Sequence, residues 1–236
     1  MHNIGLNIGK VDPSACLFTE TKLVAFCEEE RITRVKKGYN QFPIHSIEFC
    51  LSHLENGLRD VDNIILGFDH DKFLNEVPVY YELETRKYTT KTKQNLAYEK
   101  NRIERKNPDY VKNLIHTELV KAGYHKNEIP KIIWYEHHLC HALSAHLCSP
   151  FKDSLGIAVD ANGEVENLTV WEFKGTEYKK IFAKALPTSV GWYYRAFTLF
   201  CGLPPYEGEG MLMGLAPYGN HNKEIADKVA QVMVWE

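Results

Sequence analysis

The sequence predicts an α/β fold: one lobe with a mixed sheet, followed by the beginning of a second, similar lobe. Of the 236 residues, 44% are hydrophobic and 25% are charged, which is ordinary for a globular protein with a buried core. Segments with strand periodicity alternate with helical ones. The order strand, hairpin, helix, strand, helix then starts again as strand, hairpin, helix, a weak repeat of elements. We place the first lobe at residues 1–151 and the incomplete second lobe at residues 152–236.

The first lobe opens with a strand and a hairpin. Ile4, Leu6 and Ile8 alternate with other residues and lie on one face of the strand. Residues 15–18 and 23–26 are two short apolar runs separated by a polar turn, which predicts the hairpin.

The rest of the first lobe alternates between helices and strands. Pro43 suits the first turn of a helix that runs to about residue 54, and residues 61–68 read as a short buried strand. Residues of about 80–110 are polar and predict an exposed, partly helical insertion. A helix carrying Leu114, Leu119 and Val120 then ends near Gly123. Residues 131–135 predict a strand and residues 137–147 a helix.

The second lobe is predicted to be unfinished. Residues 155–160 form a strand, residues 167–174 and 177–186 a hairpin, and residues 192–200 a helix. Strands that would close this sheet do not follow, so we expect an open edge that can recruit another strand. A homodimer is the expected consequence, and an apolar carboxy-terminal end could join the contact: Val229, Val232, Met233, Val234 and Trp235. The alternative is a monomer in which this end folds back on the first lobe.

Charge and composition exclude several classes of protein. A net charge of −3 argues against a protein that mainly binds nucleic acid through its phosphates. No apolar run is long enough to span a bilayer, and the amino terminus leads directly into a strand without a secretory signal. Six cysteines are scattered without a CxxC pair, which favours buried, reduced thiols over disulfides or zinc. We therefore expect a cytoplasmic protein.

Three side chains form a candidate metal site. His137 and His141 are four residues apart, which places both imidazoles on one face of a helix. Asp160 ends an apolar strand before a glycine turn, so its carboxylate should point into a site. Two imidazoles and a carboxylate suit Fe(II), Mn(II) or Zn(II), and we expect the three to converge. The alternative is two partly exposed helix histidines and an aspartate that caps a turn.

Other segments are candidates for binding anions. The turn after Asp160 exposes backbone N–H groups that can meet phosphate oxygens, and the hairpin turn containing Asp12 could do the same. The run at residues 28–37 changes from acidic to basic; it is either solvated surface or a face for an anionic substrate. The glycine-rich residues 206–219 are either a flexible loop or backbone packed closely on a ligand or the other lobe.

Ordered blocks along most of the chain resemble the O-carbamoyltransferase family, which includes nodulation, cephamycin and tobramycin carbamoyltransferases. The blocks are Ser14-Ala15-Cys16-Leu17, the run from Glu28 to Lys36 with Phe42-Pro43, the histidine block from Glu136 to Ala142, the turn from Asp160 to Glu164, and Ser189-Val190-Gly191 with the run from Met213 to Gly219. Together these blocks are far more specific than any one of them.

The resemblance implies an actin-like ATPase (ribonuclease H-like) first domain, similar to that of the tRNA threonylcarbamoyltransferase. It places Fe(II), or another divalent metal, on His137, His141 and Asp160. A separate carboxy-terminal domain, absent from this sequence, would make carbamoyl adenylate from carbamoyl phosphate and ATP. The first domain would then transfer the carbamoyl group to a hydroxyl of a small-molecule acceptor, and the chain alone is expected to be inactive.

The resemblance also suggests roles for the remaining blocks. We assign Asp12 and Lys36 as catalytic. The residues assigned to binding ATP or carbamoyl adenylate are Gly163, Glu164, Gly191 and Gly214.

Two other functions stay open at this point. One is a threonylcarbamoyl-type transferase acting on tRNA, which the acidic charge balance does not favour. The other is a degenerate, non-catalytic nucleotide-binding or interaction module. Val11 and Met211 support the latter, because they stand where the family usually has a histidine and a lysine.

Overall fold

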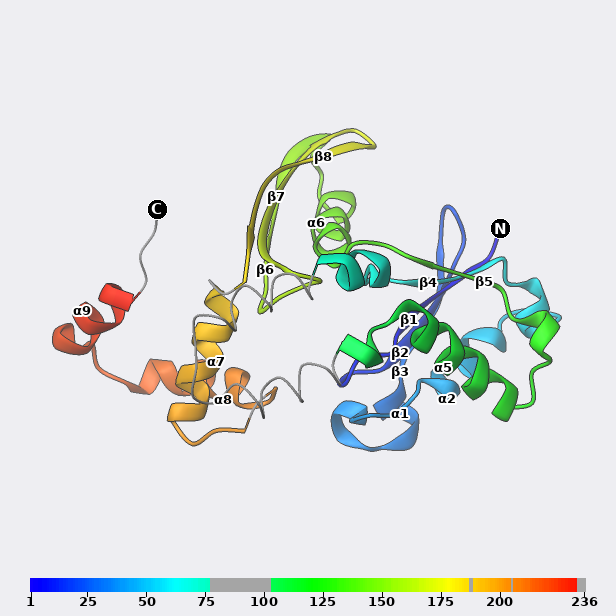
Figure 1. Ribbon diagram of the computed structural model, residues 1–236, viewed down its shortest axis with the longest axis horizontal. Coiled ribbons are helices and arrows are strands. Elements are labelled where there is room, and N and C mark those ends of the chain that lie inside the picture. Colours follow the sequence, from blue (N-terminus) through cyan, green and yellow to red (C-terminus); the bar gives the residue numbers. More distant parts are fainter. Residues whose placement is uncertain (77–102, 187–188, 205, 233–236) are drawn as a thin grey trace.

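The structure is a computed structural model that describes residues 1–76, 103–186, 189–204 and 206–232. It is an α/β protein with two sheets (Figure 1). Most of the polar insertion predicted at residues 80–110 lies outside the described residues, as do Met233, Val234 and Trp235.

The first sheet has five strands in the order β3-β2-β1-β4-β5. Its members are β1 (Asn3–Asn7), β2 (Ser14–Phe18), β3 (Leu23–Glu28), β4 (Asn63–Leu66) and β5 (Lys131–Trp134). The hairpin strands β2 and β3 are antiparallel to their neighbours, whereas β1, β4 and β5 run parallel. This mixed sheet confirms the predicted fold class.

The core of the first lobe lies between this sheet and two helices. Ile4, Leu17 and Ile64 are almost completely buried in it. The helix α2 (Ile44–Leu51) packs on β2 and β3, and α5 (Pro108–Lys121) contributes to the same core. A short 3-10 turn, η2 (Gly57–Asp60), leads into β4, and another, η3 (Lys126–Glu128), precedes β5.

The helix α5 begins where the sequence chemistry favours a start. The side chain of Asn107 accepts hydrogen bonds from the backbone of Asp109 and Tyr110, which caps the first turn. The buried face consists of Val111, Ile115 and Leu119, each four residues apart. The predicted apolar face was wrong in part, because Val120 is exposed.

The acidic-to-basic run is folded into α1 (Glu29–Thr33) and the 3-10 turn η1 (Lys36–Gly38). Glu29 is only 1% exposed. Its carboxylate accepts hydrogen bonds from the backbone N–H groups of His45 and Ser46, at the start of α2. The solvated-surface interpretation was therefore wrong for Glu29, since unsatisfied N–H groups at a helix start recruit such acceptors.

The second sheet has three antiparallel strands in the order β6-β7-β8: β6 (Asp153–Val159), β7 (Glu166–Lys174) and β8 (Glu177–Ala185). The helix α6 (His137–Cys148) packs on one face, where Leu139 and Ala142 meet Trp171 and Phe173 (Figure 1). Among the described residues, β6 pairs with β7 alone.

Four further elements follow the second sheet: α7 (Val190–Phe200), α8 (Gly208–Leu215), the 3-10 turn η4 (Ala216–Tyr218) and α9 (Lys223–Val232). Ser189 caps α7 by accepting a hydrogen bond from the Trp192 N–H. Most of the glycine-rich segment is the helix α8, so the prediction of a flexible loop was wrong. Within the described ranges, every helix is too short or too polar to cross a bilayer.

Candidate metal centre

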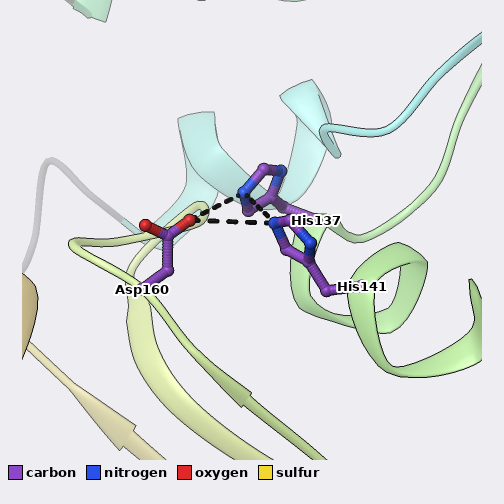
Figure 2. Close-up of side chains that lie close together, drawn as sticks. All are labelled: His137, His141 and Asp160. Atoms are coloured by element: carbon purple, nitrogen blue, oxygen red, sulfur yellow. Dashed lines mark hydrogen bonds and ion pairs between the residues drawn. The ribbon is translucent and has the colours of Figure 1, made fainter. Parts of the chain in front are cut away.

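Three side chains from two elements converge where α6 begins and β6 ends (Figure 2). The Nε2 atom of His137 lies 3.0 Å from Oδ2 of Asp160 and 3.1 Å from Nε2 of His141. The His141 Nε2 atom lies 3.8 Å from the same carboxylate oxygen. The helix supplies both imidazoles because positions four apart share a face, and Asp160 directly follows the last residue of β6.

The orientation of the His137 ring is fixed by the first lobe. Its Nδ1 atom lies 3.0 Å from the carbonyl oxygen of Gly67, which has only lone pairs to offer, so Nδ1 carries the proton. In the neutral ring Nε2 then has a lone pair that faces a carboxylate oxygen and a second imidazole nitrogen. The lone pairs of these three atoms repel one another unless a proton or a cation lies between them.

The pKa directions agree with a site that attracts positive charge. Burial would lower the pKa of His137, but its contacts with Asp160 and Gly67 outweigh burial and raise that pKa. The same contact with His137 lowers the pKa of Asp160. Burial and the neighbouring His137 lower the pKa of His141. The site therefore shifts the pKa values of the two imidazoles in opposite directions, and His137 holds a proton more readily than His141.

The spacing of the three atoms suits a transition-metal cation. Ligand atoms about 2.1 Å from a metal stand roughly 3–3.5 Å from one another in tetrahedral or octahedral geometry. All three atoms lie within 4.8 Å of each other. The side chain of His141 is 56% exposed, so further ligands can approach from that side.

The turn that follows Asp160 packs tightly against α6. Hydrogen bonds from the Asp160 N–H to Asn167 and from the Gly163 N–H to Glu166 close the turn. A Cβ atom on Gly163 would lie 3.2 Å from Cβ of His137, tighter than most Cβ contacts. Because Gly163 has no side chain, the turn can approach the helix closely.

Glu164 is buried beneath this turn. Its Oε1 atom accepts hydrogen bonds from the His137 N–H, at 3.0 Å, and from the Asp69 N–H, at 2.7 Å. The side chain is 1% exposed, and its Oε2 atom has no hydrogen-bond partner among the described residues.

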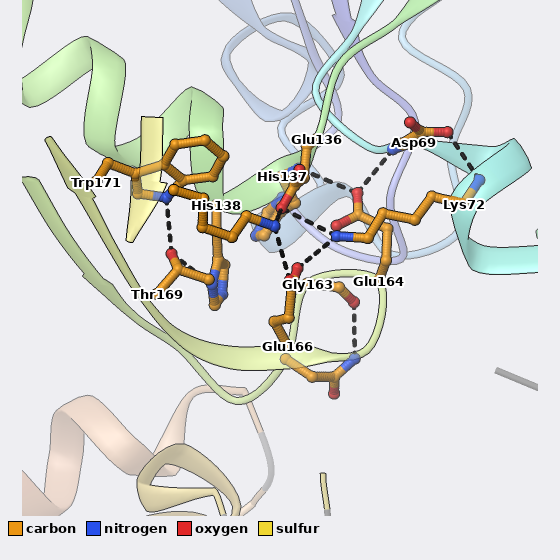
Figure 3. A network of polar contacts seen from close by, with 12 residues as sticks. Asp69, Lys72, Glu136, His137, His138, Gly163, Glu164, Glu166, Thr169 and Trp171 are labelled. Atoms are coloured by element: carbon orange, nitrogen blue, oxygen red, sulfur yellow. Dashed lines mark hydrogen bonds and ion pairs between the residues drawn. The ribbon is translucent and has the colours of Figure 1, made fainter. Parts of the chain in front are cut away.

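A ring of alternating charges lies next to Glu164 (Figure 3). The ammonium group of Lys72 lies 3.0 Å from Glu136 and 2.6 Å from Glu166. Lys180 contacts the same two carboxylates, at 2.7 Å from Glu166. Burial would raise the pKa of Glu166, but the two ammonium groups outweigh it and lower that pKa to about 2.

The three glutamates of this region are close enough together to resemble a second metal site. However, the ammonium groups of Lys72 and Lys180 already occupy the space that a cation would need. We therefore do not interpret Glu136, Glu164 and Glu166 as a metal site.

A comparison with protein families shows which family the chain belongs to. A family model described as "Carbamoyltransferase N-terminus" matches residues 2–234. The chain belongs to the carbamoyltransferase family.

The chain is also similar to parts of longer proteins from three organisms. Nodulation protein NolNO of Sinorhizobium fredii is 28% identical over 209 residues, which cover 89% of this chain and 28% of the relative. The uncharacterized protein sll1178 of Synechocystis is 31% identical over 223 residues, 92% of this chain and 35% of the relative. The uncharacterized protein MJ1058 of Methanocaldococcus jannaschii is 33% identical over 120 residues, 42% of this chain and 20% of the relative. The chain thus spans about a third of the length of the first two relatives.

The two residues predicted to be catalytic, Asp12 and Lys36, each pair with a residue outside the three predicted metal ligands. Asp12 has a positive φ of 53° and pairs with Lys37 at 3.2 Å, not with Lys36. Lys36 is exposed and lies 3.6 Å from Glu207, the residue before α8. Their catalytic roles stay predictions.

The two remaining glycines have different surroundings. A Cβ on Gly191 would lie 2.6 Å from Cα of Ala161, so α7 begins directly against the turn that carries Asp160. Around Gly214, in α8, such a Cβ would have no atom within 4 Å. Binding of ATP or carbamoyl adenylate by these residues, and by Gly163 and Glu164, stays a prediction.

Sequence reasoning missed the supporting residues of the centre. Lys72 and Lys180 stand in unremarkable polar segments, and no short motif contains either. Glu136 belongs to the histidine block, so its position before His137 was the one available signal. His138 was also missed; burial and the neighbouring His137 lower its pKa to about 4.

Proposed function

We propose that this chain is the metal-binding portion of an enzyme that transfers a carbamoyl group from carbamoyl adenylate to a hydroxyl of a small molecule. The observation that carries the proposal is the convergence of three lone-pair atoms, from His137, His141 and Asp160. Membership of the carbamoyltransferase family supports the reaction class.

We assign separate roles in this reaction to the residues of the chain. His137, His141 and Asp160 would hold Fe(II) or another divalent cation, whose charge would neutralise the adenylate phosphate and make AMP a better leaving group. Gly67 keeps the His137 ring in the tautomer that presents Nε2. Lys36 and Asp12 would act as catalytic residues from the first lobe.

Metal titration tests the centre directly. We expect wild-type protein, without oxygen, to bind one equivalent of Fe(II), and Co(II) to give a visible d–d spectrum. His141→Ala should weaken binding by roughly 100-fold, because one of three protein ligands is lost. His53→Ala is the matched control, since His53 is an exposed histidine that contacts only its own helical turn. Equal binding by all three proteins would refute the site.

Turnover tests the reaction. Protein that includes the remaining sequence found in longer relatives should release pyrophosphate from ATP when carbamoyl phosphate is present, and should release AMP and the carbamoylated product when an acceptor alcohol is added. His141→Ala in that protein should abolish carbamoyl transfer. The 236-residue chain alone should release no pyrophosphate above background. Copurifying tRNA that becomes modified would instead favour the threonylcarbamoyl reaction.

A further inference from the structure

Glu164 joins three segments that together build the metal centre (Figure 3). Its own turn carries Asp160. Its Oε1 atom binds the N–H of His137, the first residue of α6, and the N–H of Asp69. The segment around Asp69 also contains Gly67, whose carbonyl orients the His137 ring. One buried carboxylate oxygen therefore holds together the segments that position all three ligands.

These hydrogen bonds have no evident substitute. The first N–H groups of a helix lack partners within the helix, and in the described structure Glu164 is the acceptor for His137. Because Glu164 is almost completely buried, water has little access to replace it. Loss of the carboxylate should free both N–H groups and let the turn move relative to α6.

We propose that Glu164 is a positioning residue, which sets the affinity of the centre for its metal by clamping the Asp160 turn to α6 and to the segment after β4. It acts through geometry, because its Oε1 atom accepts hydrogen bonds from the backbone N–H groups of His137 and Asp69. This inference rests on the proposed metal centre.

Glu29 offers a matched control within the same chain. It is another glutamate that is 1% exposed and accepts hydrogen bonds from two backbone N–H groups at a helix start. It belongs to the first lobe and has no described contact with the three ligands. Glu29→Ala should thus perturb folding in the same manner as Glu164→Ala, without touching the clamp.

Hydrogen exchange in metal-free protein tests the clamp itself. Glu164→Ala should speed exchange at the amides of Asp69 and His137, and Glu164→Gln should restore most of the protection because its side-chain oxygen can still accept. Glu29→Ala should speed exchange at His45 and Ser46 instead. Unchanged exchange at His137 in Glu164→Ala would overturn the clamp, whether or not any metal binds.

Co(II) titration tests the consequence for the metal. We expect Glu164→Ala to weaken Co(II) binding by roughly 10- to 100-fold and to alter the d–d spectrum. Glu164→Gln should stay within about threefold of wild type, and Glu29→Ala should match wild type. Equal losses in Glu164→Gln and Glu164→Ala would overturn the proposal, because charge and not position would then matter. A wild-type protein that binds no metal would refute the metal centre, while exchange would still decide the clamp.

Discussion

The two sheets begin with equivalent strands that have different surroundings. In the first sheet, β1 pairs with β2 on one side and with β4 on the other, and Ile4 is 1% exposed. In the second sheet, β6 pairs with β7 alone among the described residues, and Ile157 is 65% exposed. Ile4 therefore lies on the face of the first sheet that packs into the apolar core, whereas Ile157 lies on a face of the second sheet that is exposed to solvent.

The second sheet compensates through its contacts with the first lobe. The helix α6 covers its inner face, and the charge ring ties Glu166 and Lys180 to Lys72 and Glu136. The candidate metal centre lies in the same region, between α6 and the end of β6. Asp160 thus follows a strand of a sheet that is held to the first lobe by both apolar and charged contacts.

The largest difference is expected between Ile4, on the covered face of the first sheet, and Ile157, on the exposed face of the second. Ile4→Ala should lower the free energy of unfolding by about 4 kcal/mol, because it leaves a cavity in a packed core. Ile157→Ala should change it by less than about 0.5 kcal/mol. Urea denaturation followed by circular dichroism measures both, and similar losses would show that the outer face of β6 is covered.

Removing one member of the charge ring should have the next largest effect. Lys72→Ala leaves Glu136 and Glu166 facing each other with one ammonium group fewer, and should lower the free energy of unfolding by about 3 kcal/mol. Lys174→Ala is the control, because its pairing with Glu172 is exposed and should contribute less than about 1 kcal/mol. Equal effects in thermal denaturation would contradict a buried role for the ring.

The ring should also make stability depend on acid. The folded-state pKa of Glu166 is about 2, below its ordinary value of 4.5. Its contribution is therefore present above pH 4.5 and is lost as the pH falls toward 2, by about 3 kcal/mol. Glu166→Gln should flatten the stability profile in this window, while Glu172→Gln on the exposed face should preserve it. Urea midpoints measured at intervals between pH 5 and 2.5 provide the test.

Alanine substitutions at Gly191 and Gly214 should have opposite effects, because Gly191 is closely packed and Gly214 faces open space. Gly191→Ala should lower the free energy of unfolding by about 1–2 kcal/mol and weaken Co(II) binding, because a Cβ there meets the backbone of Ala161. Gly214→Ala should instead be neutral or stabilising by up to about 1 kcal/mol, since Gly is unfavourable within a helix. Thermal denaturation of both variants beside the wild type measures these changes. Destabilisation by Gly214→Ala would indicate a contact outside the described residues.

The smallest effect on stability is expected for substitutions on the exposed face of β6, which should instead change the self-association of the chain. Leu155, Ile157 and Val159 are all exposed on the face of β6 that lies opposite α6. We expect the chain to self-associate through this face, and replacement of all three by threonine should reduce association while keeping the strand. Light scattering at several protein concentrations measures it. A wild-type monomer at every concentration would refute the expectation.

The sequence predicted the strands well because each has a local signal. Alternating residues marked β1, and a short polar turn marked the hairpin β2–β3. The helix face of α5 was harder, since Leu114 and Val120 look as apolar as Val111 and Ile115, and only tertiary packing decides which face is buried. The helix α8 was missed because its three glycines oppose helix formation.

The candidate metal centre also combines residues that the sequence could indicate with residues that only the fold reveals. The spacing of His137 and His141 and the strand-end position of Asp160 are local features, so the sequence indicated all three. Glu29 and Lys72 could not be assigned in this way, because their partners lie far along the chain. A buried carboxylate and a surface carboxylate have the same letter in a sequence, and only the fold distinguishes them.

The long separation between members of the charge ring has a consequence for the order of folding. Lys72 and Glu166 are 94 residues apart, and closing such a loop costs entropy before the contact is made. During synthesis, the strands of the first sheet and both histidines leave the ribosome before β7 and β8 do. We therefore expect the first lobe to fold early, and the second sheet to dock onto it afterwards. The carboxylate of Asp160 would then come into contact with the imidazoles of His137 and His141 in one of the last steps of folding.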